Sequence, residues 1–238
     1  MITQNQIKLI KSLTLKKNRD KHQLFIVEGR KNVAELIDSD YEIHSLFATK
    51  NWINDHSNIC AIKVTRSELE RISNQKNPDT VLALVKIKYS PIFSDSGVIL
   101  VLDNVSDPGN MGTIIRMCDW FGVSSIICSS NTVDSYNPKV VQSAMGSIFR
   151  VSIFYTDLLE YLKDVKFPVY GAFMNGENIQ NVKFPKDFYL VMGNEANGIR
   201  EDVAKLINRS VKIKKLGEKT ESLNVAIATS ILLYEISN

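Results

Sequence analysis

The chain has 238 residues, a formal net charge of +3, and 44% hydrophobic residues. This apolar content excludes a disordered or low-complexity protein, because it is sufficient to form a core. No apolar run is long enough to cross a bilayer, and the segment from Met1 to Asp20 is too polar for a signal peptide, so we expect a cytoplasmic protein with no membrane partner. Cys60, Cys118 and Cys128 lack the spacing of a zinc site or a disulfide framework, so we expect no metal.

Basic residues cluster in two segments of the chain. The first 31 residues hold eight basic and two acidic side chains, a net +6, which leaves −3 for the remainder. A second cluster lies between Lys205 and Lys219. Phosphate contacts need local rather than global charge, so two basic patches suit a polyanionic partner. A solvated helix face beside a mobile terminus accounts for the same charge equally well.

From Gln23 to Lys88, short runs rich in β-formers alternate with helical stretches. The pattern predicts strands over Leu24–Val27, Ile43–Ala48, Ile59–Val64 and Val81–Lys86, and helices over Gly29–Asp38 and Ser67–Ser73. Ser67 is predicted to cap the second helix, because Ser-Glu-Leu-Glu has the form of a capping box. The turn-rich segment Tyr89–Gly97 then indicates a linker, which divides the chain into domains of residues 1–90 and 97–238.

The second domain begins with a continuous apolar run, Val98–Leu102, which is typical of a strand buried on both faces of a parallel sheet. The helix that follows carries one apolar face, and four more strands are predicted. The face is Met111, Ile114, Ile115 and Cys118, and the strands are Ser125–Cys128, Pro168–Ala172, Phe188–Met192 and Val211–Ile213. The last helix, Ser222–Ile236, is apolar on nearly every side, as in a helix buried in the core or against a second subunit. This alternation predicts an α/β fold with a mostly parallel sheet and helices on both sides.

The absence of several motifs narrows the chemistry of the second domain. His22, His44 and His56 all lie in the first domain, so mechanisms based on Ser-His-Asp, Cys-His or a histidine-bound zinc are not expected in the second. No Gly-x-Gly-x-x-Gly follows a strand, and the segment Gly217–Thr220 lacks the upstream glycine and the lysine of a P-loop. Dinucleotide and nucleoside triphosphate sites are therefore not expected.

A first loop with candidate site residues connects the strand ending at Leu102 to the next helix. It contains Asp-Pro-Gly-Asn-Met-Gly, and Asn110 stands where the helix is expected to begin, so simple helix capping also explains this residue. Arg116 points away from the apolar helix face, which is equally consistent with an ordinary solvated arginine. Ligands of parallel α/β proteins bind at the carboxyl ends of strands, which is where this loop lies.

Two further loops have the same position after a strand. The second contains Met-Gly-Asn-Glu-Ala-Asn-Gly-Ile, in which glycines permit sharp turns and Glu195 is either a loop carboxylate or the partner of Arg116. The third contains Glu-Ser-Leu-Asn-Val-Ala, in which Ser222 is predicted to cap the final helix. A connector with a good helix cap is the alternative interpretation of this third loop.

In combination, the three loops resemble the three motifs of the SpoU/TrmH family of SPOUT RNA methyltransferases. The matching stretches are Asp-Pro-Gly-Asn-x-Gly-x-x-x-Arg from Asp107, Met-Gly-Asn-Glu-x-x-Gly-Ile from Met192, and Glu-Ser-Leu-Asn-Val-Ala from Glu221. The segment Phe25–Val33 is similar to the start of the substrate-binding domain that many ribosomal-RNA members carry, so the resemblance covers nearly the whole chain. Lys214 departs from the family, which usually has proline there.

The resemblance changes the expected fold and implies a cofactor. The residues alone predict an open doubly wound sheet, because chains generally avoid knots. The resemblance implies instead a SPOUT-type parallel sheet with a C-terminal trefoil knot, preceded by a small α/β ribosomal-protein-like RNA-binding domain. It implies a homodimer and a site for S-adenosylmethionine formed by backbone groups near Ala172, Gly193, Ile213 and Leu223.

The resemblance also implies a reaction and the residues that perform it. The expected activity is S-adenosylmethionine-dependent methylation of a ribose 2′-hydroxyl in structured RNA, with ribosomal RNA favoured over transfer RNA. Asn110, Arg116, Glu195, Ser222 and Asn224 match the family's catalytic positions. Because a guanidinium scarcely loses its proton, we expect Arg116 to stabilise developing alkoxide charge or to hold a phosphate. The alternatives are a non-catalytic RNA-binding or ribosome-assembly protein on this scaffold, and methylation of tRNA or of a base.

Overall fold

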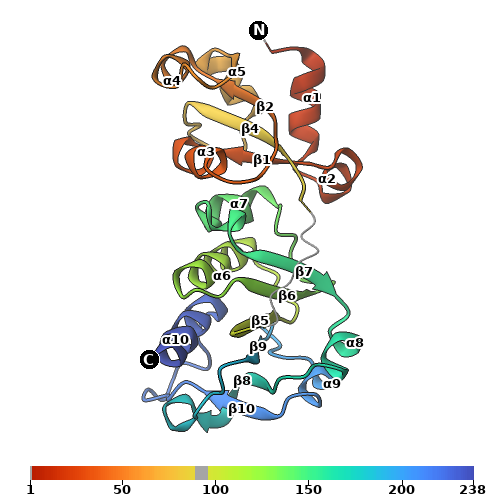
Figure 1. Ribbon diagram of the computed structural model, residues 1–238, viewed down its shortest axis with the longest axis vertical. Helices are drawn as coiled ribbons and strands as arrows, with labels where there is room; N and C mark the ends of the chain where they lie inside the picture. Colours follow the sequence, from red (N-terminus) through yellow and green to blue (C-terminus); the bar gives the residue numbers. More distant parts are fainter. Residues whose placement is uncertain (1, 89–95) are drawn as a thin grey trace. The chain divides into compact units, whose positions relative to one another are not determined.

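The computed structural model describes residues 2–88 and 96–238, and these form two compact units with one sheet each (Figure 1). The first unit contains residues 2–88 together with Asp134–Phe149, and the second contains residues 96–133 and 150–238. Most of the expected linker, Tyr89–Gly97, lies outside the described residues. In the described part of the chain, no helix is both long and apolar enough to cross a membrane.

The first unit has a four-stranded sheet in the order β1-β4-β2-β3, in which only the β2–β3 pair is parallel. Its strands are β1 (Leu24–Glu28), β2 (Ile43–Ala48), β3 (Ile62–Lys63) and β4 (Val81–Lys86). Its helices are α1 (Gln4–Ser12), α2 (Lys16–His22), α3 (Arg30–Ile37), α4 (Lys50–Asp55), α5 (Arg66–Ile72), α7 (Pro138–Ala144) and the short η1 (Ser147–Phe149). The predictions for β2 and β4 are confirmed to the residue, whereas the strand predicted over Ile59–Val64 is reduced to two residues.

The predicted cap of α5 is wrong by two residues. Thr65, not Ser67, caps this helix: its Oγ1 accepts a hydrogen bond from the Glu68 backbone N–H at 3.1 Å, and a Glu68 carboxylate oxygen accepts one from the Thr65 N–H at 2.8 Å. Both Thr65 and Ser67 stand three residues before a glutamate. The earlier start places buried Val64 just before the cap and buried Leu69 in the first turn, and this apolar pair fixes the helix entry.

The segment Asp134–Phe149 is an integral part of the first unit. Arg19 on α2 is only 2% exposed, and its Nε donates to Asp134 Oδ2 at 2.9 Å. Its Nη1 donates to the backbone carbonyl oxygens of Leu13 and Thr14 at 2.8 and 2.9 Å. The rings of Phe25 and Tyr136 pack with centroids 4.4 Å apart. An ion pair with a buried arginine therefore joins α2 to this segment.

Breaking this ion pair is expected to destabilise the first unit strongly. Asp134→Ala leaves the Arg19 guanidinium buried without its carboxylate partner, which is expected to lower the free energy of unfolding by about 3–5 kcal/mol. The matched control is Asp20→Ala, which removes the exposed Lys16–Asp20 pair and is expected to cost less than about 1 kcal/mol. Urea unfolding followed by the fluorescence of Trp52 in a Trp120→Phe background reports on this unit. Equal losses of stability in both variants would contradict the buried role of Arg19.

The second unit has a six-stranded sheet in the order β10-β8-β9-β5-β6-β7, with every pair parallel. Its strands are β5 (Val98–Leu102), β6 (Ser125–Ser129), β7 (Ser152–Thr156), β8 (Val169–Asn178), β9 (Phe188–Met192) and β10 (Arg209–Lys212). Its helices are α6 (Pro108–Trp120), α8 (Leu158–Lys163), α9 (Glu201–Ala204), α10 (Val225–Ser237) and the short η2 (Ile179–Asn181). The predicted α/β fold with a parallel sheet is confirmed, and β5 and β9 match their predicted bounds.

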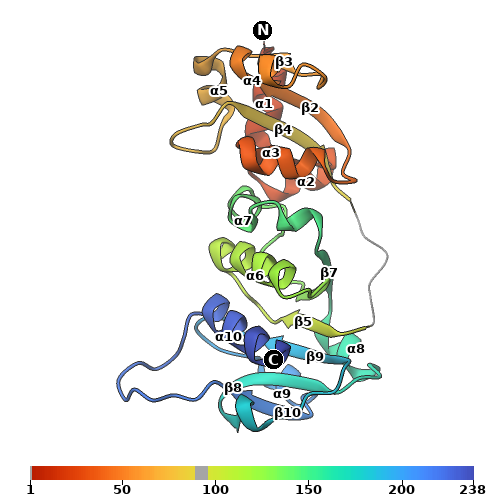
Figure 2. The ribbon, with the colours of Figure 1, turned by 60° about the vertical axis from the view of Figure 1, so that its left-hand side comes forward.

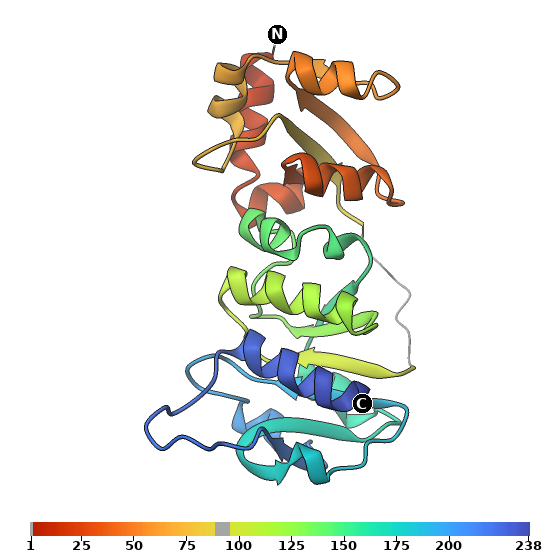
Figure 3. The ribbon, with the colours of Figure 1, turned by 90° about the vertical axis from the view of Figure 1, so that its left-hand side faces the viewer.

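Helices cover both faces of this sheet, as predicted (Figures 2 and 3). The apolar side chains of α8 and α9 pack on the face that contains Ile99, Val101 and Val191. Helices α6 and α10 pack against each other. The whole predicted apolar face of α6 is buried, including Met111 and Cys118. The central strands are thus covered on both sides, which explains their continuous apolar sequences.

The alternative interpretation of Asn110 as the cap of α6 and the prediction of Ser222 as the cap of α10 are both wrong. Helix α6 begins at Pro108, and Asp107 Oδ1 caps it by accepting from the Asn110 backbone N–H at 2.8 Å. Proline suits the first helical position because it has no N–H and its φ is fixed. Helix α10 begins at Val225, and Asn224 Oδ1 caps it by accepting from the backbone N–H of Ala226 at 2.9 Å. Asn110 and Ser222 are therefore not helix caps.

Candidate active site

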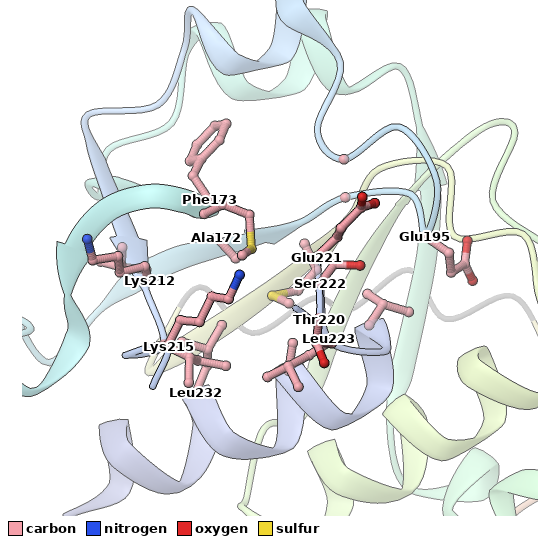
Figure 4. A pocket seen from close by; sticks show the side chains of 18 of the residues that line it. Ala172, Phe173, Glu195, Lys212, Lys215, Thr220, Glu221, Ser222, Leu223 and Leu232 are labelled. Carbon is pink, nitrogen blue, oxygen red and sulfur yellow. The ribbon is translucent and has the colours of Figure 1, made fainter. Parts of the chain in front are cut away.

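A pocket of about 610 Å³ lies in the second unit beside β8, β9, β10 and α10 (Figure 4). Its walls are residues 172–174, 192–198, 211–217 and 220–223, with Val225, Ala228 and Leu232. All four residues expected near the cofactor, Ala172, Gly193, Ile213 and Leu223, line this pocket. Of the expected catalytic residues, Glu195 and Ser222 also line it, whereas Asn110, Arg116 and Asn224 are outside its lining.

The pairing of β10 with β8 shapes one wall of the pocket. Arg209 and Ser210 lie opposite Tyr170 and Gly171, but the next two residues lie opposite Glu177 and Asn178. Residues 172–176 are therefore left out of the pairing, and this stretch carries Ala172, Phe173 and Met174 into the lining. A Cβ on Gly176 would be 2.6 Å from the backbone of Ser210 and Val211, so only glycine permits this close approach.

A tight turn from Gly193 to Gly198 forms the adjoining wall. The backbone groups of Asn194 and Gly198 exchange two hydrogen bonds of 2.9 Å, and Asn194 Oδ1 accepts from the N–H groups of Ala196 and Asn197 at 3.0 Å. A Cβ on Gly193 would be 2.2 Å from the Gly198 carbonyl carbon. The turn is thus closed on itself, and glycine is required at position 193 because the two sides of the turn approach each other closely.

Side-chain hydrogen bonds join the three motif loops. Glu195 Oε1 accepts from Asn110 Nδ2 at 2.9 Å and from the Asp107 N–H at 3.2 Å. Glu195 Oε2 accepts from both the backbone N–H and the hydroxyl of Ser106 at 3.3 Å. Asn110 Oδ1 in turn accepts from Asn224 Nδ2 at 2.9 Å. Asn110 is therefore the bridge between the glycine turn and the start of α10, and Figure 4 shows Glu195 at one end of the pocket, apart from Ala172 and Phe173.

The environment of Glu195 favours its ionised form. Partial burial acts to raise the pKa of this carboxyl group, but the hydrogen bonds from Asn110 and from the backbone of Asp107 and Ser106 outweigh burial. The net effect lowers the pKa of Glu195 below its ordinary value of 4.5. A carboxylate with a lowered pKa is a weak base near neutral pH, so its hydrogen-bonding position suits holding the loops together.

The lowered pKa predicts how the contribution of Glu195 to stability depends on pH. A depressed native pKa contributes stability that is present above the unfolded-state value, about 4.5, and is lost as the pH falls through the native value. Glu195→Gln removes this dependence, so the stability difference between wild type and variant should be largest near pH 7 and should shrink below about pH 4.5. Urea unfolding at a series of pH values measures the difference. A difference that stays constant down to pH 3 would contradict the assigned shift.

Arg116 lies on the exposed side of α6 and is not paired with Glu195. Within the described ranges Arg116 has no hydrogen bond or ion pair, so the alternative in which it pairs with Glu195 is not observed. Its guanidinium therefore holds no other described residue of the second unit in place. No group of three or more His, Cys, Asp and Glu side chains among residues 2–88 and 96–238 is placed to hold a metal ion.

The ion pair of Asp103 and Arg200 was missed from the sequence. Asp103 is fully buried at the end of β5, and its two carboxylate oxygens accept from the backbone N–H and the Nε of Arg200 at 2.9 and 2.8 Å. Partial burial acts to lower the pKa of Arg200, but the hydrogen bond and charge of Asp103 raise it overall. The pair fixes the end of the glycine turn to the central strand. An acidic residue directly after a fully apolar strand is the signal that indicates such a buried partner.

Family models match both parts of the chain. The model described as the SpoU rRNA Methylase family matches residues 97–234, which include all nine predicted site residues. The model described as an MRM3-like substrate binding domain matches residues 4–83.

Individual proteins are similar over nearly the full length. The 23S rRNA (guanosine(2553)-2′-O)-methyltransferase RlmP of Bacillus subtilis is 28% identical to this chain, and the similar region covers 97% of this chain and 95% of RlmP. A TrmH-family structure from Porphyromonas gingivalis is 36% identical with a TM-score of 0.91, covering 99% of this chain and 98% of that one. An AdoMet-bound rRNA methyltransferase structure from Sinorhizobium meliloti is 29% identical with a TM-score of 0.89, covering 99% and 95%.

Proposed function

Because the chain belongs to the SpoU rRNA methylase family, we propose that it methylates a ribose 2′-hydroxyl of ribosomal RNA with S-adenosylmethionine. The observation that carries this proposal is the hydrogen-bonded junction of Glu195, Asn110 and Asn224 beside the 610 Å³ pocket. The names of the similar Bacillus and Sinorhizobium proteins support ribosomal RNA as the substrate class, and the AdoMet in the latter supports the cofactor.

The lining of the pocket fits S-adenosylmethionine. Leu223, Val225 and Leu232 provide apolar surface for a purine ring and a methionine chain, and the closed turn that contains Gly193 adds backbone groups to the lining. We assign binding of the cofactor to backbone groups near Ala172, Gly193, Ile213 and Leu223. When bound, S-adenosylmethionine would supply the methyl group of its positively charged sulfur: the S–CH₃ bond would break as the bond to the ribose oxygen forms, S-adenosylhomocysteine would be the leaving group, and the hydroxyl proton would pass to water.

Arg116 is the residue to which we assign stabilisation of the ribose oxygen. A cation near this oxygen favours the negative charge that develops as the proton leaves, and the planar guanidinium also suits a neighbouring phosphate. Asn110, Glu195, Ser222 and Asn224 are assigned to the same reaction, because hydrogen bonds join three of them and Ser222 lines the pocket. Alignment of the hydroxyl with the methyl group is the main physical demand on these residues.

We extend the proposal to the organisation of the chain. Residues 1–90 are proposed as the RNA-binding domain and residues 97–238 as the catalytic domain, with the C-terminal segment threaded as a trefoil knot. Asp134–Phe149, within the second range, folds with the first unit and is proposed to act with the RNA-binding domain. The match of the substrate-binding model to residues 4–83 and of the SpoU rRNA Methylase model to residues 97–234 support this organisation. An rRNA substrate also supports a cytoplasmic location.

A homodimer through α6 and α10 is also part of the proposal. Trp120 is 81% exposed at the end of α6, and Ile227 and Tyr234 on α10 are 54% and 56% exposed. Large apolar side chains exposed on two helices that pack together are typical of an interface. Covering them with a second copy would bring Arg116, which lies on α6, close to that interface.

Methyl transfer to separated RNAs tests the proposal. The purified protein is incubated with methyl-labelled S-adenosylmethionine and with unmodified large-subunit, small-subunit or transfer RNA. Label in a ribosomal RNA, recovered as a 2′-O-methylated nucleotide, is the expected result. Label in transfer RNA would contradict ribosomal RNA as the substrate, and label on a base would contradict the ribose oxygen as the target atom. No label together with no binding of the cofactor would overturn the proposal in favour of a non-catalytic RNA-binding protein.

A further inference from the structure

A second pocket, of about 660 Å³, lies entirely within the first unit and shares no residue with the candidate active site. Its lining residues come mainly from helices α3 and α4, the loop between α5 and β4, and α7, and Figure 2 shows the course of these elements. Three carboxamides, those of Asn32, Gln75 and Gln142, belong to its lining, and we call it the amide pocket. None of the predicted site residues accounts for it.

The carboxamides of Gln75 and Gln142 leave a donor and an acceptor available. Gln75 Nε2 donates to Gln142 Oε1 at 2.8 Å, and Asn32 Nδ2 donates to the same oxygen at 3.4 Å. Across the described part of the chain, the Gln142 NH₂ group and the Gln75 carbonyl oxygen have no other partner. A linked pair of amides that offers one donor and one acceptor matches the hydrogen-bonding edge of a nucleobase.

Asn32 adds an acceptor whose hydrogen-bonding capacity is unused. This residue is 3% exposed and lines the pocket, and its Nδ2 also donates to the Glu28 carbonyl oxygen at 3.2 Å. Its Oδ1 is buried and has no partner within residues 2–88 and 96–238. Buried polar groups in native proteins are nearly always paired, so an orphaned acceptor in a pocket wall indicates a place where polar contacts are completed on binding.

The charges around the amide pocket favour a neutral ring inside it. Three carboxylates line it against two cations, and two of the carboxylates already accept several hydrogen bonds. Glu28 accepts from Ser73 and Asn74, and Asp79 accepts from the Arg30 backbone N–H at 2.9 Å. A phosphate inside would therefore be repelled. Lys31 is exposed and has no ion pair among the described residues, so it remains available to a phosphate outside the pocket.

An aromatic pair forms another part of the lining. The rings of Trp52 and His56 are stacked with centroids 4.1 Å apart and planes 6° apart. His56 Nδ1 donates to the Trp52 carbonyl oxygen at 2.9 Å, which fixes the orientation of the imidazole. Trp52 is itself only 3% exposed, so the stacked pair forms a fixed aromatic wall of the pocket. Unpaired RNA bases are recognised where aromatic side chains lie beside groups that hydrogen-bond to their edges.

We propose that the amide pocket binds one unpaired base of the substrate RNA, with Gln75 and Gln142 contacting its edge and Lys31 contacting a flanking phosphate. This proposal rests on the proposed function, because it assumes that the substrate is RNA. It adds a recognition site in the first unit that is separate from the site of methyl transfer.

Fluorescence of Trp52 tests binding directly. The chain has two tryptophans, so Trp120→Phe leaves Trp52 as the only reporter. This full-length protein, saturated with S-adenosylhomocysteine to block the other pocket, is titrated with the four single-base RNA tetranucleotides. Quenching that differs among the four, and weakening of the tightest by about tenfold in Gln142→Ala, are expected. Equal quenching by all four that Gln142→Ala leaves unchanged would overturn the proposal.

Steady-state methylation of unmodified ribosomal RNA provides the second readout. Gln142→Ala and Gln75→Ala are each expected to raise the KM for RNA about tenfold with kcat within about twofold, because the pocket binds RNA away from the reacting atoms. The matched control is Gln4→Ala, which replaces an exposed glutamine of α1 in the same unit that has no side-chain hydrogen bond among the described residues. Using both Gln75 and Gln142 variants guards against the case in which one fails to fold.

The two proposals fail in distinguishable ways. Base-dependent quenching of Trp52 without methyl transfer to any RNA would support the amide pocket and contradict the proposed activity. Normal methylation with an unchanged KM in both glutamine variants would overturn the amide pocket and leave the proposed activity intact.

Discussion

Replacing Arg116 by alanine is expected to lower the rate of methyl transfer by at least about a hundredfold, the effect of removing one group that stabilises charge in a transition state. Binding of S-adenosylmethionine and the Tm should remain unchanged. Arg116 is exposed on α6, is outside the pocket lining, and has no structural partner among the described residues. Truncating it therefore removes a cation without opening a cavity or leaving a buried group unpaired.

Two variants make this expectation specific. Arg116→Lys keeps the charge but loses the planar, two-pronged donor, so an intermediate rate indicates that guanidinium geometry contributes beyond charge. Arg71→Ala removes an exposed arginine of α5 that likewise has no partner in the described ranges, and it should not affect kcat. Rates are measured with saturating RNA and cofactor, and cofactor binding by calorimetry. Turnover of Arg116→Ala close to that of wild type would exclude Arg116 from the reaction.

Most of the strands could be predicted from local sequence, because their apolar residues are contiguous and end sharply. The run Val98–Leu102 is bounded by glycine and aspartate, and it becomes the central strand β5. Strand β7, Ser152–Thr156, was not predicted, although its run Ile-Phe-Tyr is as long as the run Ile-Ile-Cys of the predicted strand β6. It lies at the sheet edge and is only half-buried.

Helix ends were harder to predict, because several residues near each end are able to act as caps. Asp107 and Asn110 both have capping side chains, and the proline between them decides the outcome by occupying the first position of α6. This leaves the Asn110 side chain free for Glu195 and Asn224. A one-turn error in a cap therefore changes the role assigned to a residue from local to long-range.

Contacts between segments that are distant in the sequence could not be predicted from periodicity and spacing, because these patterns describe only neighbouring residues. The resemblance brought Asn110, Glu195 and Asn224 into one list, but the order of their hydrogen bonds is seen only in the fold. The association of Asp134–Phe149 with the first unit depends on Arg19 and Asp134, which are 115 positions apart. Charged residues are seldom fully buried, so nothing local to Arg19 indicates that it is buried.

Replacing Gly193 by alanine is expected to weaken binding of S-adenosylmethionine by roughly a hundredfold. The added Cβ would be 2.2 Å from the Gly198 carbonyl carbon and 2.3 Å from the Ile199 nitrogen, so one side of the turn must move. Overpacking of this kind costs about 1–3 kcal/mol of conformational free energy. The variant incurs this cost when the turn returns to its native shape to bind the cofactor, and the upper end corresponds to about a hundredfold in affinity. The displacement would reach Glu195, which lies two residues further along the same turn.

Gly217→Ala is the matched control, because Gly217 lines the same pocket, a Cβ there meets nothing within 4 Å, and its backbone needs no left-handed conformation. Calorimetric titration of each variant with S-adenosylmethionine separates an effect of local backbone contact from a general effect of losing a pocket glycine. Equal affinities in Gly193→Ala and Gly217→Ala would contradict the role of the closed turn. A loss confined to Gly193→Ala would instead locate the rigid wall of the cofactor site at the end of β9, where the central sheet holds it in place.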